Sequence, residues 1–131
     1  MTDTATSSHT LRKKILVVDD NSDIRRLLRL SIENPYEIIE AEDGETALQL
    51  ADQHRPDLIL LDIMMPGSID GLQVLDILKK TPELQHIPVA MLTARGQSSD
   101  FEFGMNKGAD AYFVKPFSPL LLLQWIASRL A

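Results

Sequence analysis

Short, nearly continuous apolar runs alternate with longer amphipathic stretches from Lys13 to the end of the chain. Such runs are typical of strands buried on both faces, and the stretches between them are typical of helices that cover a sheet. We expect strands near residues 14–19, 36–41, 57–62, 87–92 and 110–114. We expect helices near residues 22–33, 44–54, 70–80, 97–107 and 119–130.

The repeated strand and helix order predicts an α/β fold with a doubly wound parallel sheet. Connections between parallel strands are almost always right-handed, and they place helices on both faces of the sheet. Sheets of this kind bind ligands beyond the carboxyl ends of their strands, at the point where the strand order reverses. The residues that follow each apolar run are therefore the candidates for a site.

Local signals support several of these boundaries. Asp43 and Gly44 form a turn and provide a capping side chain for the second helix. Ser118 followed by Pro119 predicts the start of the last helix, with Ser118 as N-cap and Pro119 in the first helical position. Pro88 lies beside a predicted strand start, where a missing amide hydrogen is tolerated.

Length and composition favour one small domain in the cytoplasm. A chain of 131 residues is long enough for one core and too short for two ordinary domains. It has no cysteine, which excludes disulfides and thiolate metal sites. A net charge of −6 argues against direct binding to nucleic acid, because phosphates require an excess of basic residues.

The start of the chain predicts a tail and not a membrane segment. Residues 1–10 are small and polar without periodicity, so we expect a disordered tail over residues 1–12 and a folded domain over 13–131. Arg12, Lys13 and Lys14 precede an apolar run that is too short for an export signal or a membrane span. We interpret them as a solvated approach to a buried strand.

Three carboxylates stand at the ends of two predicted strands. Asp19 and Asp20 follow one apolar run, and Asp62 follows another. If the two strands are neighbours, these like charges meet at one edge of the sheet and repel one another unless a cation lies between them. We therefore expect a hard divalent cation, most plausibly Mg²⁺, which prefers oxygen ligands. The alternative is that the first two acids belong to a turn and Asp62 caps a helix.

Two more strand ends carry polar side chains. The fourth predicted strand leads to Thr93 and Ala94, and the fifth leads to Lys115. A hydroxyl and a cation beside acids and a metal suit a transferred phosphoryl group, whose oxygens must be met from several directions. Thr93 alone would be interpreted as a helix cap, and Lys115 alone as a solvated lysine. Their joint position at one edge favours a site.

At this level of detail the sequence resembles the receiver domain of two-component response regulators, including the chemotaxis response regulator. The resemblance covers residues 13–130 and implies a flavodoxin-like, five-stranded parallel sheet with strand order 2-1-3-4-5 and five helices. The residues that carry it are Ile15-Leu16-Val17-Val18-Asp19-Asp20, Leu60-Leu61-Asp62-Ile63-Met64-Met65-Pro66, Asp70-Gly71, Leu92-Thr93-Ala94, Gly108-Ala109-Asp110-Ala111-Tyr112 and Lys115-Pro116-Phe117.

The resemblance implies that Asp62 accepts a phosphoryl group from a sensor histidine kinase or a histidine phosphotransfer protein. Asp20 and Asp62 would then bind Mg²⁺ directly, Asp19 would act through a bound water, and the backbone carbonyl of Met64 would be a further ligand. Such a protein is a phosphorylation-activated switch and not an enzyme in the usual sense, since it catalyses only its own phosphorylation and slow dephosphorylation.

The same resemblance assigns the remaining residues. Lys115 would pair with the phosphoryl oxygens, Thr93 would move inward to hydrogen-bond one of them, and Ala94 would leave room for the group to enter. Tyr112 would be the switch aromatic that changes rotamer as the threonine moves. Without the resemblance, Tyr112 would be interpreted as an ordinary half-buried strand tyrosine.

Two departures from the family pattern affect these expectations. The loop between Pro66 and Asp70 has one residue more than the commonest receiver loop, which should change its surface and leave the chemistry intact. Met64 and Arg95 occupy the two variable positions that influence the lifetime of the phosphoryl group. Because neither readily acts as a base, we expect a long-lived acyl phosphate.

The last predicted helix carries more apolar residues than its core face needs. Leu122, Ile126 and Leu130 have the spacing of a core face, whereas Leu120 and Leu121 fall outside it. This surface either binds a partner or a second copy through the face of the fourth and fifth elements, or simply covers the flank of the sheet.

Ala111 and Leu121 occupy positions where receivers of DNA-binding regulators often carry acids. A salt-bridged dimer of that type is therefore not expected.

Two other classes of function use similar residues. An aspartyl-phosphate hydrolase typically has a second acid two residues after its nucleophile, where this chain has Met64. A pseudo-receiver that acts only as an interaction module would be expected to lack one of the three acids or Lys115, all of which are present. A true receiver is the function that the sequence favours.

Overall fold

The computed structural model describes residues 12–94 and 108–130. This part of the chain forms a parallel five-stranded sheet in the order β2-β1-β3-β4-β5, as predicted. The strands are β1 (Lys14–Val18), β2 (Glu37–Ala41), β3 (Leu58–Asp62), β4 (Val89–Ala94) and β5 (Ala111–Lys115).

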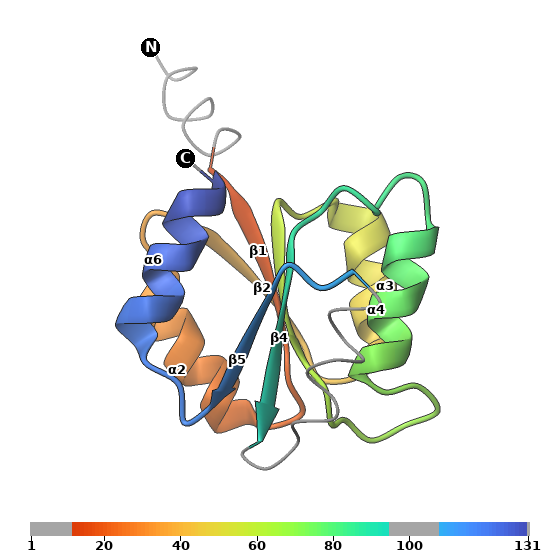
Figure 1. Cartoon of the computed structure of the whole chain (residues 1–131), viewed down its shortest axis with the longest axis horizontal. Coiled ribbons are helices and arrows are strands. Elements are labelled where there is room, and N and C mark those ends of the chain that lie inside the picture. The colour runs from red at the N-terminus through yellow and green to blue at the C-terminus, as the bar shows by residue number, and fades with distance from the viewer. Residues whose placement is uncertain (1–11, 95–107, 131) are drawn as a thin grey trace.

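Four helices within the described ranges cover the two faces of the sheet (Figure 1). They are α2 (Ser22–Ile32), α3 (Gly44–His54), α4 (Gly71–Lys80) and α6 (Pro119–Leu130). Helices α2 and α6 lie on one face, and α3 and α4 lie on the other. The helix expected at 97–107 falls outside the described residues. The doubly wound α/β architecture is confirmed.

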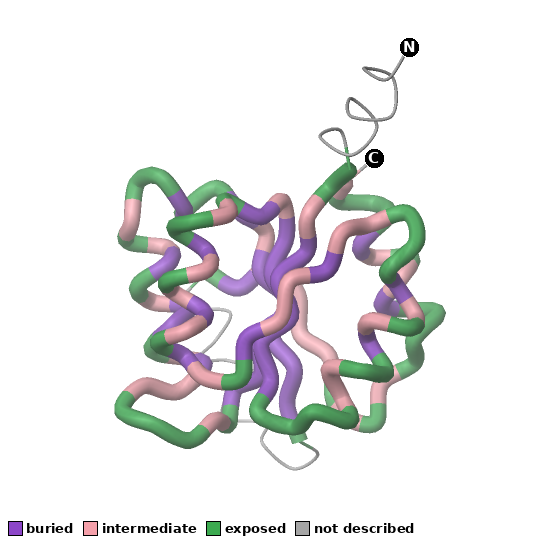
Figure 2. The backbone as a smooth tube through the Cα atoms, turned by 180° about the vertical axis from the view of Figure 1, so that it is seen from behind, coloured by how far each residue is buried: buried purple, intermediate pink, exposed green. Residues whose placement is uncertain are grey.

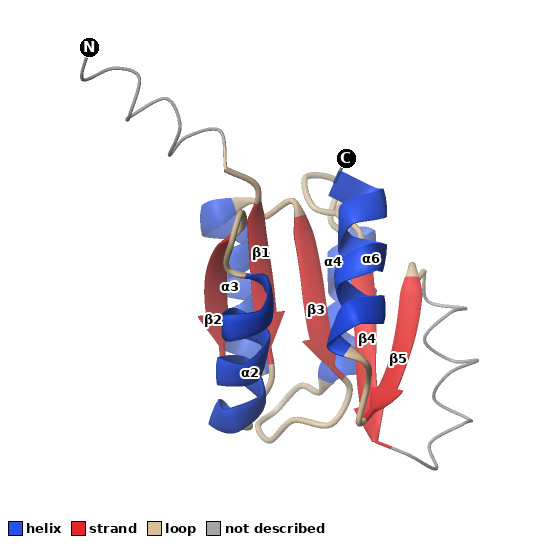
Figure 3. Ribbon diagram, turned by 90° about the vertical axis from the view of Figure 1, so that its left-hand side faces the viewer, coloured by secondary structure: helices blue, strands red, loops and turns tan. Residues whose placement is uncertain are grey.

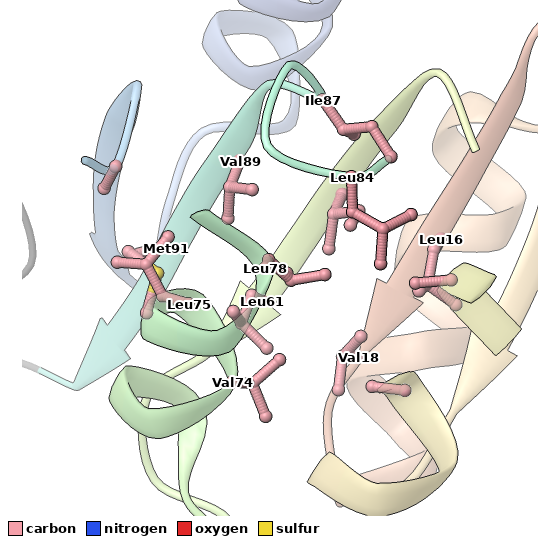
Figure 4. Close-up of a cluster of buried hydrophobic side chains, with 14 of the residues drawn as sticks. Leu16, Val18, Leu61, Val74, Leu75, Leu78, Leu84, Ile87, Val89 and Met91 are labelled. Carbon is pink, nitrogen blue, oxygen red and sulfur yellow. The ribbon is translucent and has the colours of Figure 1, made fainter. Parts of the chain in front are cut away.

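Alternate residues of each strand enter two separate cores, because successive side chains point to opposite faces of a sheet. Leu16, Val18 and Leu61 pack beneath α3 and α4, in the cluster drawn in Figure 4. Ile15 and Leu60 pack beneath α2 and α6. The central strands are therefore buried along their length, as Figure 2 shows. This explains why their sequences are continuous apolar runs.

Side-chain caps start the helices close to the predicted residues. The Asp43 carboxylate accepts the amide of Thr46 at 2.7 Å, and the Ser118 hydroxyl accepts the amide of Leu121 at 3.2 Å, so both predicted caps are confirmed. The hydrogen bond to the backbone of Thr46 lowers the pKa of Asp43.

Two further caps were not predicted. Asn21 caps α2, and Asp70 forms a capping box with Gln73 at the start of α4. Asp62 therefore does not cap the following helix, because Asp70 has that role.

The fourth strand differs most from its predicted range. It begins at Val89, after Pro88, and extends to Ala94. Proline has no amide hydrogen, and the carbonyl of Pro88 still accepts the amide of Ile59 at 2.9 Å, so pairing starts at the proline through its oxygen. Thr93 and Ala94 consequently lie within β4 and pair with Val114 and Lys115, whereas we had expected them after its end.

Arg12 is not merely solvated, as the sequence had suggested. Its guanidinium donates to the carbonyl oxygens of Pro35, Glu33 and Tyr36 at 3.1, 2.8 and 2.7 Å, and so closes the connection between α2 and β2. No helix within residues 12–94 and 108–130 has the length and apolar character needed to span a membrane.

Candidate functional site

The carboxyl ends of the parallel strands share one edge of the sheet, where the arrowheads lie in Figure 3. Val18 pairs with Leu61, so the residues that end these segments, Asp19 and Asp62, are neighbours. Carboxylate oxygens of Asp19, Asp20 and Asp62 all lie within 4.8 Å of one another. The predicted clustering of the three acids is confirmed.

Lys115 joins this acidic cluster from the last residue of β5. Pairing of Ala94 with Lys115 places the lysine beside the end of β4. Its Nζ donates to Asp19 Oδ2 at 2.8 Å and lies 3.4 Å from Asp62 Oδ1. One ammonium group thus bridges carboxylates that are 96 and 53 residues away from it in the chain.

Asp19 is the most completely anchored acid of the cluster. It has no exposed surface, and Asp62 is only 4% exposed, whereas Asp20 is exposed. The second carboxylate oxygen of Asp19, Oδ1, accepts the amide of Asn21 at 2.9 Å, and its own amide donates to the carbonyl of Ala41 at 3.1 Å. The deepest acid is therefore held in a single orientation.

The electrostatics of the cluster favour a proton or a cation on Asp62. Burial raises the pKa of Asp62 to about 6, and the negative charge of Asp19 acts in the same direction against the opposing effect of Lys115. Burial alone would lower the pKa of Lys115, but its hydrogen bond to Asp19 and the charge of Asp62 outweigh this effect and raise it. Lys115 therefore remains a cation.

Thr93 and Ala94 lie beside the acids at the end of β4. Asp62 pairs with Leu92, the residue before Thr93. Thr93 is buried, and its hydroxyl lies 3.4 Å from the carbonyl oxygen of Ala94. Ala94 is exposed.

Tyr112 is half-buried on β5, where it pairs with Met91 of β4. Its ring packs against the cluster beneath α3 and α4. Arg95, the other residue expected to influence the site from this region, falls outside the described residues.

The loop after Asp62 is held against the start of α4. Met64 is exposed, and the amide of Gly71 donates to the carbonyl of Ile63 at 2.8 Å. A side-chain Cβ at Gly71 would collide with the backbone oxygen of Asp62 and would lie 2.7 Å from Ile63 Cα. The close approach thus requires glycine, a constraint visible only once the loop is folded.

Ser68, within the longer loop, is also tied down. Its hydroxyl donates to Glu45 Oε1 on α3 at 2.7 Å. This hydrogen bond holds the longer loop against α3. Neither Gly71 nor Glu45 was assigned a part in the site from the sequence.

The donor set fits a hard divalent cation. Three carboxylates supply oxygen ligands in close proximity, and oxygen ligands are those that a hard cation prefers. Nitrogen and sulfur ligands are absent from this cluster among the described residues. The acidic cluster is thus consistent with a metal site of the kind found in receiver domains.

Comparison with known proteins agrees with the fold and with this set of residues. Residues 15–127 match the family model for the response regulator receiver domain. The chain therefore belongs to the response regulator receiver family.

Relatives of known sequence or structure support this assignment. The chain is 44% identical over 110 residues to the phosphate regulon transcriptional regulatory protein PhoB of Klebsiella pneumoniae, with 83% of this chain and 48% of PhoB aligned. It is similar to a putative response regulator from Chloroflexus aurantiacus, with 33% identity, a TM-score of 0.85, and coverage of 91% and 98% of the two chains. For the chemotaxis response regulator CheY4 of Vibrio cholerae, identity is 30%, the TM-score is 0.82, and coverage is 90% and 98%.

Membership in this family defines the class of function. The family is one of phospho-accepting signalling domains of the two-component type and not of classical enzymes, so the hydrolase interpretation of this domain is set aside. The acids and Lys115 form the pocket typical of phosphorylation-activated response regulators, and the family implies a histidine kinase as partner. The chain spans about half the length of the curated relatives it matches.

Proposed function

We propose that Asp62 is the phospho-acceptor of this receiver. The observation that carries the proposal is the Lys115 ammonium group, which lies between Asp19 and Asp62 at hydrogen-bonding distance from both. A cation in this position offsets the charge of the acids and lies within reach of a group attached to Asp62.

In the proposed reaction, a carboxylate oxygen of Asp62 attacks the phosphorus of a phosphohistidine on the donor protein. The new oxygen–phosphorus bond forms as the phosphorus–nitrogen bond breaks, and the imidazole leaves with the electron pair of that bond. The product is an acyl phosphate on Asp62. Lys115 would hold one phosphoryl oxygen, and Thr93 would donate a hydrogen bond to another.

The acidic cluster would hold Mg²⁺. Asp20 and Asp62 would bind it directly, Asp19 through water, and the backbone carbonyl of Met64 would complete the protein ligands. Bound Mg²⁺ would supply charge neutralisation for the phosphoryl oxygens. Asp19 is already hydrogen-bonded through both carboxylate oxygens, to Lys115 and to the amide of Asn21, which suits an indirect role.

The signal would be a shift between two conformations, in which Thr93 moves toward the phosphoryl group and Tyr112 changes rotamer. Ala94 would admit the group because its side chain ends at Cβ. Because Met64 has neither an acidic nor an amide side chain, the acyl phosphate is expected to be long-lived.

We place the domain at residues 13–131, with a tail at 1–12, and expect the protein to act in the cytoplasm.

The output surface would be the face of the fourth and fifth elements. Leu120 and Leu121 on α6 are 63% and 59% exposed, while Leu122 and Ile126 are buried as predicted. This exposure supports a contact surface over mere coverage of the flank of the sheet. This surface is the proposed contact for a second copy or an output partner, without paired charges at Ala111 and Leu121.

Labelling with a small phosphodonor tests the proposal. The parent protein, incubated with Mg²⁺, should gain one phosphoryl group per chain by mass spectrometry, and Asp62→Asn or a chelator should abolish the gain. Continuous turnover of the donor would indicate a hydrolase, and a parent chain that stays unlabelled would indicate an interaction module. Either result would overturn the proposal.

A further inference from the structure

Arg25, a residue without a part in the proposed chemistry, binds the backbone of the acidic cluster. It lies on α2, and its Nη1 donates to the carbonyl oxygen of Asp19 at 2.8 Å. Its Nε donates at the same time to Glu40 Oε1 on β2, at 3.0 Å. A guanidinium group is planar and rigid, so these two hydrogen bonds fix its orientation.

Glu40 also accepts a hydrogen bond from a second arginine, through its other carboxylate oxygen. Arg29 Nε donates to Glu40 Oε2 at 2.7 Å, and Arg29 Nη2 lies 3.3 Å from the carbonyl oxygen of Ile38. Burial would raise the pKa of Glu40, but hydrogen bonds from Arg29 and Arg25 outweigh burial and lower it. Both carboxylate oxygens of Glu40 are thus engaged, and it anchors Arg25 as an anion.

The oxygen that Arg25 binds belongs to the peptide unit between Asp19 and Asp20. The amide of Asp19 is bound to Ala41 on β2, so the backbone of Asp19 is hydrogen-bonded on both sides. Asp20 is exposed, and the position of its carboxylate depends on its backbone. Fixing this peptide unit therefore fixes the orientation of the Asp20 backbone, and with it the position of the Asp20 carboxylate near Asp62.

Glu40 also keeps the positive charge of Arg25 away from the acids. An unpaired guanidinium beside three carboxylates would turn to pair with them and would compete with a bound cation. With its Nε on Glu40, Arg25 contacts only the neutral carbonyl of Asp19 within the cluster.

We propose that Arg25, anchored by Glu40, is a positioning residue that presets the acidic cluster for Mg²⁺. The inference rests on the proposed function, in which this cluster binds Mg²⁺. Groups that orient metal ligands without touching the metal commonly change its affinity by an order of magnitude or more. Arg25 acts through the backbone of Asp19 and does not contact the reacting atoms.

The chain offers a matched control for this role. Arg29 lies one helical turn after Arg25 and binds the same glutamate, but its hydrogen bonds go to Glu40 and Ile38 and not to the acidic cluster. Arg25→Met and Arg29→Met therefore remove equal charge and one ion pair each with Glu40. Only the first removes the hydrogen bond to Asp19.

Calorimetric titration with Mg²⁺ measures the effect, with folding checked by circular dichroism. We expect Arg25→Met to weaken Mg²⁺ binding about tenfold and Arg29→Met to change it less than about twofold. Arg25→Lys keeps the charge but lacks the planar fork, and we expect a loss of about threefold. In ¹⁵N NMR spectra, Arg25→Met should shift the amide signal of Asp20 and Arg29→Met should leave it in place.

The outcomes separate this inference from the function on which it rests. If the parent binds Mg²⁺ and both Arg25 variants bind it equally well, or if Arg29→Met weakens binding as much as Arg25→Met, the positioning role is wrong and the Mg²⁺ site stands. If the parent protein itself binds no Mg²⁺, the proposed function fails. Should Arg25→Met not fold, the threefold loss in Arg25→Lys decides the question.

Discussion

Lys115 Nζ lies 2.8 Å from Asp19 Oδ2 and 3.4 Å from Asp62 Oδ1, so the lysine is closer to the deepest acid than to the proposed phospho-acceptor. This arrangement offsets the charge of a fully buried carboxylate and leaves Asp62 within reach. The stability of the site and its chemistry therefore depend on the same ammonium group.

Replacement of Lys115 with methionine should destabilise the protein more in chelator than in Mg²⁺. Without the ammonium group, the buried carboxylate of Asp19 loses a charged partner, at a cost of about 1–3 kcal/mol. Bound Mg²⁺ would restore part of the missing positive charge. Urea unfolding in both conditions measures the difference.

Lys79→Met is the control for this variant. Lys79 pairs with Asp110 at 3.3 Å, away from the acidic cluster. The stability lost in Lys79→Met should therefore be the same with and without Mg²⁺. Equal losses for Lys115→Met in chelator and in Mg²⁺ would contradict the shared role.

Asp62→Asn should stabilise the metal-free protein at neutral pH. The pKa of Asp62 is raised to about 6 from an ordinary 3.8, so the folded state binds the proton more tightly than the unfolded state. Stability of the parent therefore falls as pH rises from about 4 to 6, by up to an amount on the order of 3 kcal/mol. The gain in Asp62→Asn should be small near pH 4 and constant above pH 7.

Unfolding free energies at several pH values in chelator measure this gain. Asp52→Asn, which makes the same change at an exposed acid on α3, is the matched comparison. A stabilisation by Asp62→Asn that does not vary with pH would mean that relief of the carboxylate charge is not its cause.

Gly71→Ala should damage both folding and phosphorylation. The added methyl group collides with the backbone oxygen of Asp62, so the start of α4 must move away from β3. We expect a loss of about 2–4 kcal/mol and slower labelling, measured by thermal unfolding and by mass spectrometry.

Gly67→Ala provides a comparison in the same loop. Gly67 has a φ of +104°, but a Cβ there would meet only Glu45 Oε1, at 3.9 Å. The stability lost in Gly67→Ala should come from backbone strain alone, about 1–2 kcal/mol. Labelling rates should stay near those of the parent. If both variants slow labelling equally, the close approach at Gly71 is not what matters.

Thr93→Val should separate phosphorylation from signalling. Valine keeps the volume of the buried side chain and removes the hydroxyl. We expect one phosphoryl group per chain, as in the parent, but a smaller change in the NMR signals of the Tyr112 ring. Thr81→Val, at the C-terminal end of α4, should retain the full change. An undiminished response in Thr93→Val would exclude the hydroxyl as the trigger.

Leu121→Glu should prevent self-association of the phosphorylated protein. Leu120 and Leu121 present exposed apolar surface on α6, and a glutamate in this surface opposes its burial in an interface. Analytical ultracentrifugation should show a larger species for the phosphorylated parent and a monomer for the variant. Leu30→Glu, at an exposed leucine of α2, is the control. A parent that remains monomeric when phosphorylated would point to an output partner instead.

The architecture was predictable because its signals are local. Apolar runs such as Leu58–Leu61 and caps such as Asp43 and Ser118 depend on neighbours in sequence, and they placed most elements within about two residues. The fourth strand was displaced because Pro88 participates in pairing through its oxygen alone. The helix expected at 97–107 remains a prediction.

Residue types at the strand ends were sufficient to predict that Asp19, Asp20, Asp62 and Lys115 lie together, since parallel strands bring their carboxyl ends to one edge whatever the details of packing. The role of Thr93 remains a prediction. Contacts between distant segments were decided only by the tertiary structure: Arg25 on the Asp19 carbonyl, Arg12 on the α2 to β2 connection, and Gly71 against Asp62. A side chain's partner across the fold depends on register and helix placement, and no local pattern in the sequence encodes either one.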